Sequence, residues 1–400
     1  MITISSYLHR DDLKDIIRRW MYDDLHPSDA EMISRLVHFN NLYVAYYLHD
    51  FSGKLFRILH GKDPLQKQIV LKGDLKDALV KNPPYLNARI EELIRQYNLH
   101  PGRFFRETPC RATLFFLERH GLPIHVGSCR IKRVRRLAEK GARRLIDGIF
   151  DAIKRHADEL ADGRAKQLGI GRENMITTSE EMLAEFLRAE ERLLEDFRLR
   201  RPIVGIQEQT INDVAGIKVI LEDGEQGRLM DALQNMEGCD VTEEEKHSGR
   251  YNAVNRIIRY RPPKEEILKS LPYQMWSSAI RTGEGSGAAA IQRDFVDFVR
   301  TGEESVSIEI IASDYQEMLE SEIGRCMHED RIIEQRLQQQ YRGHLAKNVE
   351  YLMRFLFMFP FSAKRRLEDL PVKLWNRYLP DYFDAVIADL FEIAKETYPE

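Results

Sequence analysis

The sequence predicts an α+β protein in which a mixed β-sheet domain is flanked by a large N-terminal helical region and by C-terminal helices. Three observations lead to this class. Apolar residues recur every three or four positions over most of residues 1–200 and again after residue 314, as in amphipathic helices. Runs rich in Val and Ile alternate with turns between residues 202 and 313. The 400-residue chain is also long enough for two or three domains with real cores.

Residues 1–200 are expected to form a helical domain. The three- and four-residue spacing predicts helices over 11–25, 29–59, 74–81, 86–97, 108–121, 130–163 and 180–200. Turn signals separate several of them, namely NPP at 82–84, HPG at 100–102 and GLP at 121–123.

Residues 201–330 are expected to form the sheet domain, and residues 331–400 a C-terminal helical segment. Strands are predicted over 216–222, 251–262 and 304–313, with a helix over 225–236 between the first two. A helix that begins near residue 314 is expected to return the chain to helical structure.

Composition and charge point to a soluble cytoplasmic protein with no membrane partner. The net charge of −4 gives no global attraction to nucleic acid or to a membrane. The longest apolar run, at 351–361, is interrupted by Arg354 and Pro360 and is too short to span a bilayer. The four scattered cysteines favour free thiols over disulfides or a zinc site.

Two acids lie at the ends of predicted strands. Asp213 precedes the first strand, which also carries Lys218, and Glu309 lies within the third strand between Ile308 and Ile310, which face the other way. If the two strands are adjacent, the carboxylates can converge. Paired carboxylates suit Mg²⁺, which takes one or two of them together with substrate phosphates. The alternative is a strand-entry cap at Asp213 and a solvent-facing Glu309.

A possible base-stacking residue opens the second strand. Tyr251 follows a glycine turn and is flanked by Arg250 and Arg256. A tyrosine ring can stack on a purine while nearby guanidinium groups hold phosphates. The alternative is an ordinary strand aromatic after a hairpin turn. Glu322 and His328, six positions apart on the next helix, have the spacing of an ordinary helix-surface pair.

Four segments in chain order resemble the synthetase domain of the RelA/SpoT-type alarmone synthetases, a family with a nucleotidyltransferase fold. They are DVAGIKVI at 213–220, SGRYNAVN at 248–255, VSIEIIAS at 306–313 and SEIGRCMHE at 321–329. The resemblance covers about residues 200–330. It implies a nucleotidyltransferase-like sheet that uses ATP and GTP as substrates and Mg²⁺ as cofactor.

The resemblance also implies roles for individual residues. Asp213 would be the metal-binding acid, and Glu309 a second catalytic acid that activates a ribose 3′-hydroxyl or binds the metal. Tyr251 would stack on guanine. The remaining nucleotide-binding residues would be Lys218, Arg250, Asn255, Arg256 and His328.

The sequence departs from the family pattern in several places. Lys218 replaces an arginine, Asn255 a histidine and Ala312 an arginine. Lysine lacks the planar fork with which arginine grips phosphate oxygens, and asparagine cannot titrate near neutral pH. No basic phosphate-binding loop is recognisable at 201–212, directly before the first strand, and residues 264–301 are an insertion between the second and third strands.

A basic segment at 131–144 is a candidate RNA-binding or phosphate-binding surface. Seven of its residues are cationic: Lys132, Arg133, Arg135, Arg136, Lys140, Arg143 and Arg144. Such a density can hold a phosphate backbone. The alternative is charge pairing with the acidic helix predicted at 180–200.

Two functions follow from these observations. The first is Mg²⁺-dependent transfer of a pyrophosphoryl or nucleotidyl group from ATP to a guanine nucleotide or to an RNA 3′ end. The second is a catalytically degenerate protein on the same fold that binds a nucleotide or RNA and regulates a partner. The sequence leaves an oligomeric state open in both.

Overall fold

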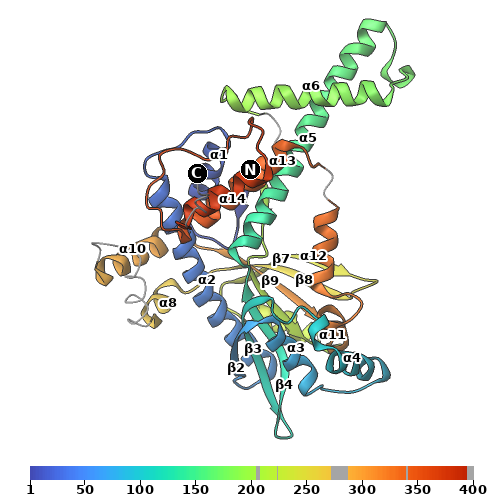
Figure 1. Cartoon of the computed structure of the whole chain (residues 1–400). Helices are drawn as coiled ribbons and strands as arrows, with labels where there is room; N and C mark the ends of the chain where they lie inside the picture. The colour runs from blue at the N-terminus through green and yellow to red at the C-terminus, as the bar shows by residue number, and fades with distance from the viewer. Residues whose placement is uncertain (204–207, 223, 272–286, 339–340, 394–400) are drawn as a thin grey trace, which may run out of the picture.

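The fold is built on one mixed sheet, seen in a computed structural model that describes residues 1–203, 208–222, 224–271, 287–338 and 341–393 (Figure 1). Within these residues the sheet has seven strands in the order β2-β3-β4-β6-β9-β8-β7. In that order the strands are Leu65–Leu71, Pro109–Arg119, Leu122–Ile131, Ala215–Ile220, Val306–Ser313, Ala253–Tyr260 and Cys239–His247. A separate parallel pair joins β1 (Ile2–Ile4) to β5 (Gln209–Ile211). A mixed α+β architecture is therefore confirmed.

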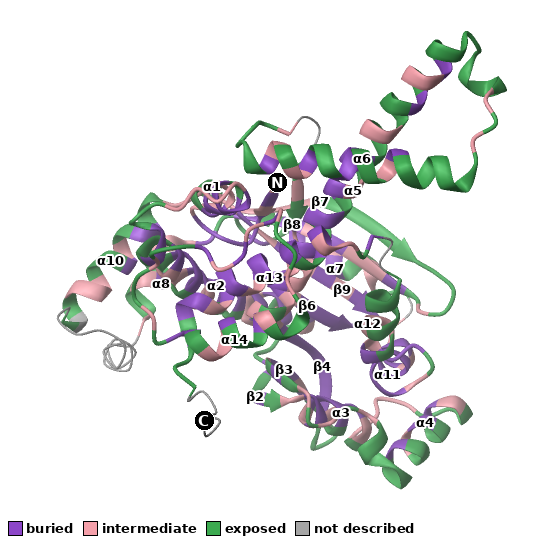
Figure 2. Cartoon of the chain, turned by 45° about the horizontal axis from the view of Figure 1, so that its top comes forward, coloured by how far each residue is buried: buried purple, intermediate pink, exposed green. Residues whose placement is uncertain are grey.

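One face of the sheet carries the larger hydrophobic core. The long helix α2 (Asp29–His60) packs on this face beside α7 (Gln226–Gln234), and both contribute buried apolar side chains (Figure 2). The same core continues into α1, α5, α10, α13 and α14, which span Arg10–Met21, Val134–Leu168, Ala288–Thr301, His344–Met358 and Pro380–Leu390. The short helix α8 (Lys264–Ser270) packs beside α10.

The opposite face carries a smaller core. The helices α3 (Lys72–Lys81), α4 (Ala88–Leu99) and α11 (Tyr315–Ile323) cover it around the buried side chains of Leu79, Leu114 and Leu319. The sheet is thus enclosed between two helical layers at this end. At the other end of the same face the helices are replaced by a cavity, described below.

Two helices project from the body. α5 has 35 residues, and its distal half packs against α6 (Ser179–Arg198) to form an arm that extends away from the sheet (Figure 1). Figure 2 shows that most of this arm is exposed, in contrast to the buried sheet and α2. In the part of the chain that the structure describes, no helix is both long and apolar enough to cross a bilayer.

The prediction of a helical domain over residues 1–200 is wrong, because three of the seven strands come from residues 65–131. The segment read as a helix over 108–121 is β3, at whose centre Leu114 and Phe115 are both fully buried, one on each face of the sheet. A strand covered on both faces shows a continuous apolar run, which has no two-residue period to separate it from a helix. The domain boundary expected near residue 200 therefore separates strands that belong to the same sheet.

Predictions for the second half of the chain agree better with the structure. The strands expected at 216–222, 251–262 and 304–313 are β6, β8 and β9, and the helix expected at 225–236 is α7. The helix expected from residue 314 is divided into α11, α12 (His328–Leu337) and α13. The insertion at 264–301 forms α8 and α10 at its two ends, while residues 272–286 lie outside the described part.

Close packing between α2 and the sheet predicts a strict requirement for glycine at position 127. A Cβ atom there would overlap the ring of Phe56 and stand 2.5 Å from the carbonyl oxygen of Lys218. We expect Gly127→Ala to lower the free energy of unfolding by about 3 kcal/mol, as overpacking of a core does. Urea denaturation of the full chain measures this change.

Gly163, within α5, is the matched control. A Cβ atom at this position meets nothing within 4 Å, so Gly163→Ala should stabilise the helix by about 0.5–1 kcal/mol. Equal stability of the Gly127→Ala variant and the native chain would show that α2 does not pack on the sheet as described.

Candidate functional site

The two predicted acids lie on adjacent strands. β6 and β9 are parallel neighbours, and Gly216 of β6 is paired with Glu309 of β9. Asp213 lies two residues before β6 and lines the same cavity as Glu309. The strands that carry or follow the two acids are therefore adjacent, as convergence of the two carboxylates requires.

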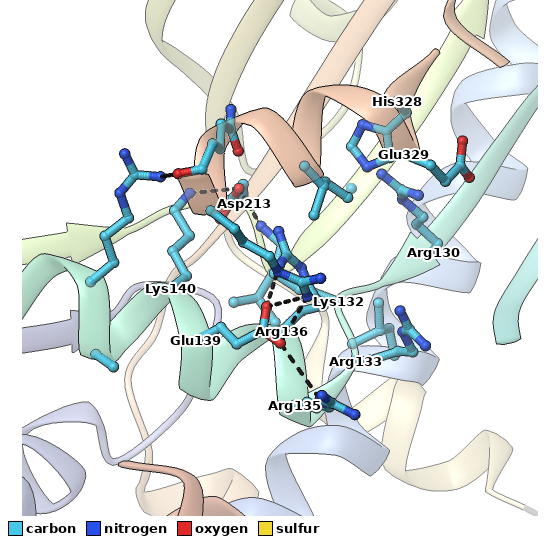
Figure 3. A pocket seen from close by; sticks show the side chains of 18 of the residues that line it. Arg130, Lys132, Arg133, Arg135, Arg136, Glu139, Lys140, Asp213, His328 and Glu329 are labelled. Carbon is cyan, nitrogen blue, oxygen red and sulfur yellow. Dashed lines mark hydrogen bonds and ion pairs between the residues drawn. The ribbon is translucent and has the colours of Figure 1, made fainter. Parts of the chain in front are cut away.

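The cavity lies at the end of the sheet, between the strand ends and the helices α5, α12 and α13 (Figure 3). Its volume is about 1070 Å³. Thirteen lysines and arginines line it against six carboxylates: Glu139, Asp147, Asp213, Glu309, Glu329 and Glu350. A concave surface with such an excess of positive charge attracts and concentrates anionic ligands.

Asp213 is held at the cavity floor by two ammonium groups. Its Oδ2 accepts a hydrogen bond from Lys132 Nζ and another, at 2.7 Å, from Lys140 Nζ. Burial acts to raise the pKa of this carboxyl, but attraction by Lys132 and Lys140 is stronger and lowers the pKa to about 2. Asp213 is therefore ionised throughout the physiological range.

Glu309 has the opposite electrostatic environment. Ile308 and Ile310 are fully buried in the larger core, so the alternation of β9 turns Glu309 to the cavity side, as predicted. Its Oε1 accepts a hydrogen bond from Asn255 Nδ2 at 3.1 Å. Burial, and next the negative charge of Asp213, raise the pKa of Glu309 above its ordinary value.

The oxygens at the floor suit a hard divalent cation. Asp213 Oδ1 and Asn255 Oδ1 are both buried and have no hydrogen-bond partner among the described residues. Like the carboxylate of Glu309, they are oxygen atoms of the kind that Mg²⁺ prefers. The described residues contain no group of three or more histidine, cysteine or acidic side chains placed to hold a metal. A cation here would therefore need phosphate or water oxygens as further ligands.

The cations nearest the acids come from a part of the sequence that we did not expect to supply them. Arg130 is paired with Gly216 across β4 and β6, and Lys132 follows the end of β4. The next residues open α5, whose first turns carry Arg136 and Lys140 along the cavity wall (Figure 3). The basic segment thus supplies the cations that lie beside Asp213. The density of basic residues at 131–144 was the one sequence signal that could have placed these cations in the site.

Charge pairing of this basic segment with α6 is not what the structure shows. The acidic residues of α6 pair instead with the distal half of α5, where Arg164 contacts Glu181 and Glu185 at 2.8 Å each. The ion pairs of the basic segment are made with Asp213 and Glu139. Its positive charge therefore faces the cavity and not the acidic helix.

Of the six predicted nucleotide-binding residues only His328 lines the cavity, and Lys218, Arg250, Tyr251, Asn255 and Arg256 do not. Arg256 lies on the opposite face of the sheet, where it donates to Glu244 at 2.9 Å and to Gln226 at 3.1 Å. Arg250 is exposed in the β7–β8 turn, and its carbonyl accepts a hydrogen bond from the thiol of Cys326.

Tyr251 lies nearer to the site, but its ring is already in contact with a cation. The guanidinium of Arg331 lies over the ring, 4.8 Å from its centroid. The residue is half-buried beside α12 and is not part of the cavity lining. A stacking role for Tyr251 would require Arg331 to move aside or to share the base.

Lys218 is committed to a buried ion pair. Its Nζ contacts Glu322 Oε1 at 2.9 Å, and Lys72 Nζ contacts Glu322 Oε2 at 2.7 Å. Glu322 is fully buried, so the expectation of a helix-surface residue is wrong. Burial alone would raise the pKa of Glu322, but Lys218 and Lys72 hold it well below the ordinary value.

The same charged cluster extends to the cavity. Lys76 contacts Glu329 at 3.3 Å, and both Glu329 and His328 line the cavity at the start of α12 (Figure 3). Burial, followed by repulsion from Arg130 and Lys72, lowers the pKa of His328 well below its ordinary value. His328 is therefore a neutral imidazole at neutral pH, able to donate or accept one hydrogen bond.

Comparisons with protein-family models, with curated proteins and with solved structures give no match to this chain.

The buried position of Glu322 predicts a large effect of removing its charge. Glu322→Gln leaves two ammonium groups with no carboxylate between them, so we expect a loss of about 3–5 kcal/mol in the free energy of unfolding. Chemical denaturation measures the loss. Glu91→Gln, at an exposed position on α4, is the control and should change stability by less than about 0.5 kcal/mol. Similar stability of the two variants would contradict the buried ion pair.

Proposed function

We propose that this chain is a Mg²⁺-dependent nucleotidyltransferase-type enzyme that moves a pyrophosphoryl or nucleotidyl group from ATP to a hydroxyl group of a guanine nucleotide or of an RNA 3′ end. The observation that carries the proposal is the parallel pairing of β6 with β9, which brings Asp213 and Glu309 to the floor of a strongly cationic cavity. Anionic substrates and a pair of carboxylates are what phosphoryl transfer requires.

In the proposed reaction the acceptor hydroxyl oxygen attacks a phosphorus atom of ATP. Attack at the β-phosphorus forms the new O–P bond, breaks the bond to the α–β bridging oxygen and releases AMP. Attack at the α-phosphorus releases pyrophosphate instead. The hydroxyl proton passes to the carboxylate of Glu309, whose raised pKa suits it to accept a proton. The side chains of Arg130, Lys132 and Lys140 are available to stabilise the phosphate charge.

In this reaction Asp213 would hold the Mg²⁺ ion, and the carboxylate of Glu309 would be left to accept the proton. When bound, the ion supplies neutralisation of phosphate charge and polarisation of the reacting phosphoryl group. The unpartnered oxygens of Asp213 and Asn255 support this assignment. Lys132 and Lys140 at present neutralise Asp213, and both line the cavity, so an entering polyphosphate would compete with Asp213 for their ammonium groups.

The resemblance to RelA/SpoT-type synthetases supports the same assignment. The four resembling segments are β6 with the residues before it, the β7–β8 turn, β9, and the junction of α11 with α12. Three of these segments contribute lining residues to one cavity: Asp213, Glu309 and His328.

A second candidate function is nucleotide binding without turnover. Two observations favour it: Asp213 forms ion pairs with two lysines, and Lys218 forms an ion pair with Glu322. A protein that binds anions through its lysines needs Asp213 only to keep the empty site electrically balanced.

Replacement of Asp213 distinguishes these two functions. We expect Asp213→Asn to abolish the Mg²⁺ dependence of ATP binding and to abolish turnover. Without Mg²⁺ the same change should strengthen ATP binding about tenfold, because it removes a negative charge and frees two ammonium groups. Calorimetric titration of the full chain with ATP, with and without Mg²⁺, measures both effects.

Asp231→Asn is the control for this experiment, since Asp231 is an exposed acid on α7, outside the cavity lining. It should leave every value unchanged. An Asp213→Asn protein that still turns over at the native rate would contradict the role of Asp213 in the proposed enzyme. A native chain that binds ATP without Mg²⁺ dependence and shows no turnover would leave the binding protein.

The hydrogen bond from Asn255 predicts a shift in pH dependence. Because Asn255 Nδ2 donates to Glu309, it favours the ionised form of that carboxyl. Asn255→Ala removes this effect and raises the pKa of Glu309 further. The acidic limb of kcat/KM against pH should therefore move to higher pH, whatever the change in the plateau. Initial rates at saturating Mg²⁺ measure the profile.

Glu309→Gln sets the baseline for the pH series and should lower kcat by roughly 10²–10⁴-fold. An acidic limb that stays in place in Asn255→Ala, or that moves to lower pH, would contradict the role of Glu309 as proton acceptor.

A further inference from the structure

One face of α5 forms a row of cations that runs out of the cavity. Arg133 precedes the helix, and Arg136, Lys140, Arg143 and Arg144 lie on it; all of them line the cavity. At about 100° per residue these positions fall within an arc of roughly 100°, so they share one face. With a rise of about 1.5 Å per residue, the row from Arg133 to Arg144 is about 16 Å long.

The row passes from a half-buried end to an open one. Arg136 and Lys140 are half-buried beside Asp213, whereas Arg143 and Arg144 are exposed. The opposite wall at the open end carries the exposed cations Arg336 and Lys347, from α12 and α13. A ligand can therefore have one end at the floor and leave the protein along α5.

The inner cations of the row form ion pairs, whereas among the described residues the outer ones, Arg143 and Arg144, form none and interact with Asp147 only at longer range. Lys140 is paired with Asp213, and Glu139 pairs with both Arg136 and Arg336. Among the contacts of the described residues, Arg143 donates to the carbonyl oxygen of Gln335, at 3.2 Å. Arg144 forms no ion pair within the described residues, and the one acid on this stretch of the face is Asp147. The positive charge at the outer end is thus available to a ligand.

The length of this row exceeds what a mononucleotide needs. A nucleic-acid strand in stacked form carries one phosphate about every 3.4 Å of its axis, so a row about 16 Å long spans several successive phosphates. Among the described residues, no phenylalanine, tyrosine or tryptophan lines the cavity. Recognition along the row would therefore depend on the phosphate backbone and not on stacking with the bases.

We propose that the acceptor is the 3′ end of a single-stranded oligonucleotide, with its phosphodiester backbone bound along the Arg133–Arg144 face of α5. The position of the 3′-hydroxyl at the floor rests on the proposed function. The backbone site itself stands on the cation row and does not depend on turnover.

The test measures oligonucleotide and ATP binding separately. We would titrate the full chain with 5′-labelled single-stranded RNA and DNA of 12 mixed-sequence nucleotides and follow fluorescence anisotropy from low to high salt. For Arg143→Ala/Arg144→Ala we expect at least a tenfold loss of affinity at low salt. The slope of log K against log salt should fall by about 1.4, since two phosphate contacts are removed. ATP affinity should fall much less than oligonucleotide affinity, because both residues lie at the outer end of the cavity.

The control variant is Lys166→Ala/Arg188→Ala, which removes the same charge from exposed positions on the distal arm. It should bind oligonucleotides like the native chain. Equal binding of RNA and DNA would support recognition of the shared backbone, and preference for RNA would support it with an added contribution from the 2′-hydroxyl. Loss of ATP binding with retained, salt-dependent oligonucleotide binding would refute the proposed function but not this site.

Two results would overturn the inference. In the first, neither the RNA nor the DNA oligonucleotide binds, whether or not inorganic polyphosphate binds. In the second, the control variant weakens oligonucleotide binding as much as Arg143→Ala/Arg144→Ala does.

Discussion

The parallel pairing of β6 with β9 is the constraint on which the candidate site depends. In this register Gly216 lies between Arg130 of β4 and Glu309 of β9, so a cation and an acid flank a position that has no side chain. A Cβ at Gly216 would come only within 3.8 Å of Glu309. Parallel neighbours require a long crossover, and here it includes α7, β7, β8, α8 and α10. Segments distant in sequence are thereby brought to one cavity floor.

Two charge systems, one half-buried around Asp213 and one buried around Glu322, fix the elements around that floor. Asp213, just before the start of β6, pairs with Lys132 and Lys140, which lie 81 and 73 residues away in the sequence. Glu322 joins α11 to Lys218 of β6 and to Lys72 at the start of α3, 104 and 250 residues away. Buried ion pairs are costly to form, but removal of one partner is costlier still, because a charge is left without compensation. We infer that both systems hold the cationic wall in register with the acids.

The sequence predicted which face of a strand a residue occupies, because that depends on local periodicity. It did not predict which strands are neighbours, because that depends on strand order in the sheet. The alternation of Ile308, Glu309 and Ile310 predicted which residue would leave the core, and the structure agrees. The same alternation places Asn255 and Arg256 on opposite faces of β8, so they could not both face Glu309. By contrast, no local pattern shows that Arg130 will lie beside Gly216. β4 was missed because a strand buried at its centre has no period-2 signal.

The central claim is that the cationic cavity with Asp213 and Glu309 at its floor is a nucleotide site. The most direct measurement is the melting temperature of the full chain with ATP or GTP, with and without Mg²⁺. A ligand at about one hundred times its Kd stabilises the folded state by about 2.7 kcal/mol. We predict a Mg²⁺-dependent rise of several degrees with at least one of the two nucleotides. A melting temperature that does not change with either nucleotide, at millimolar concentration and with Mg²⁺ present, would contradict the claim.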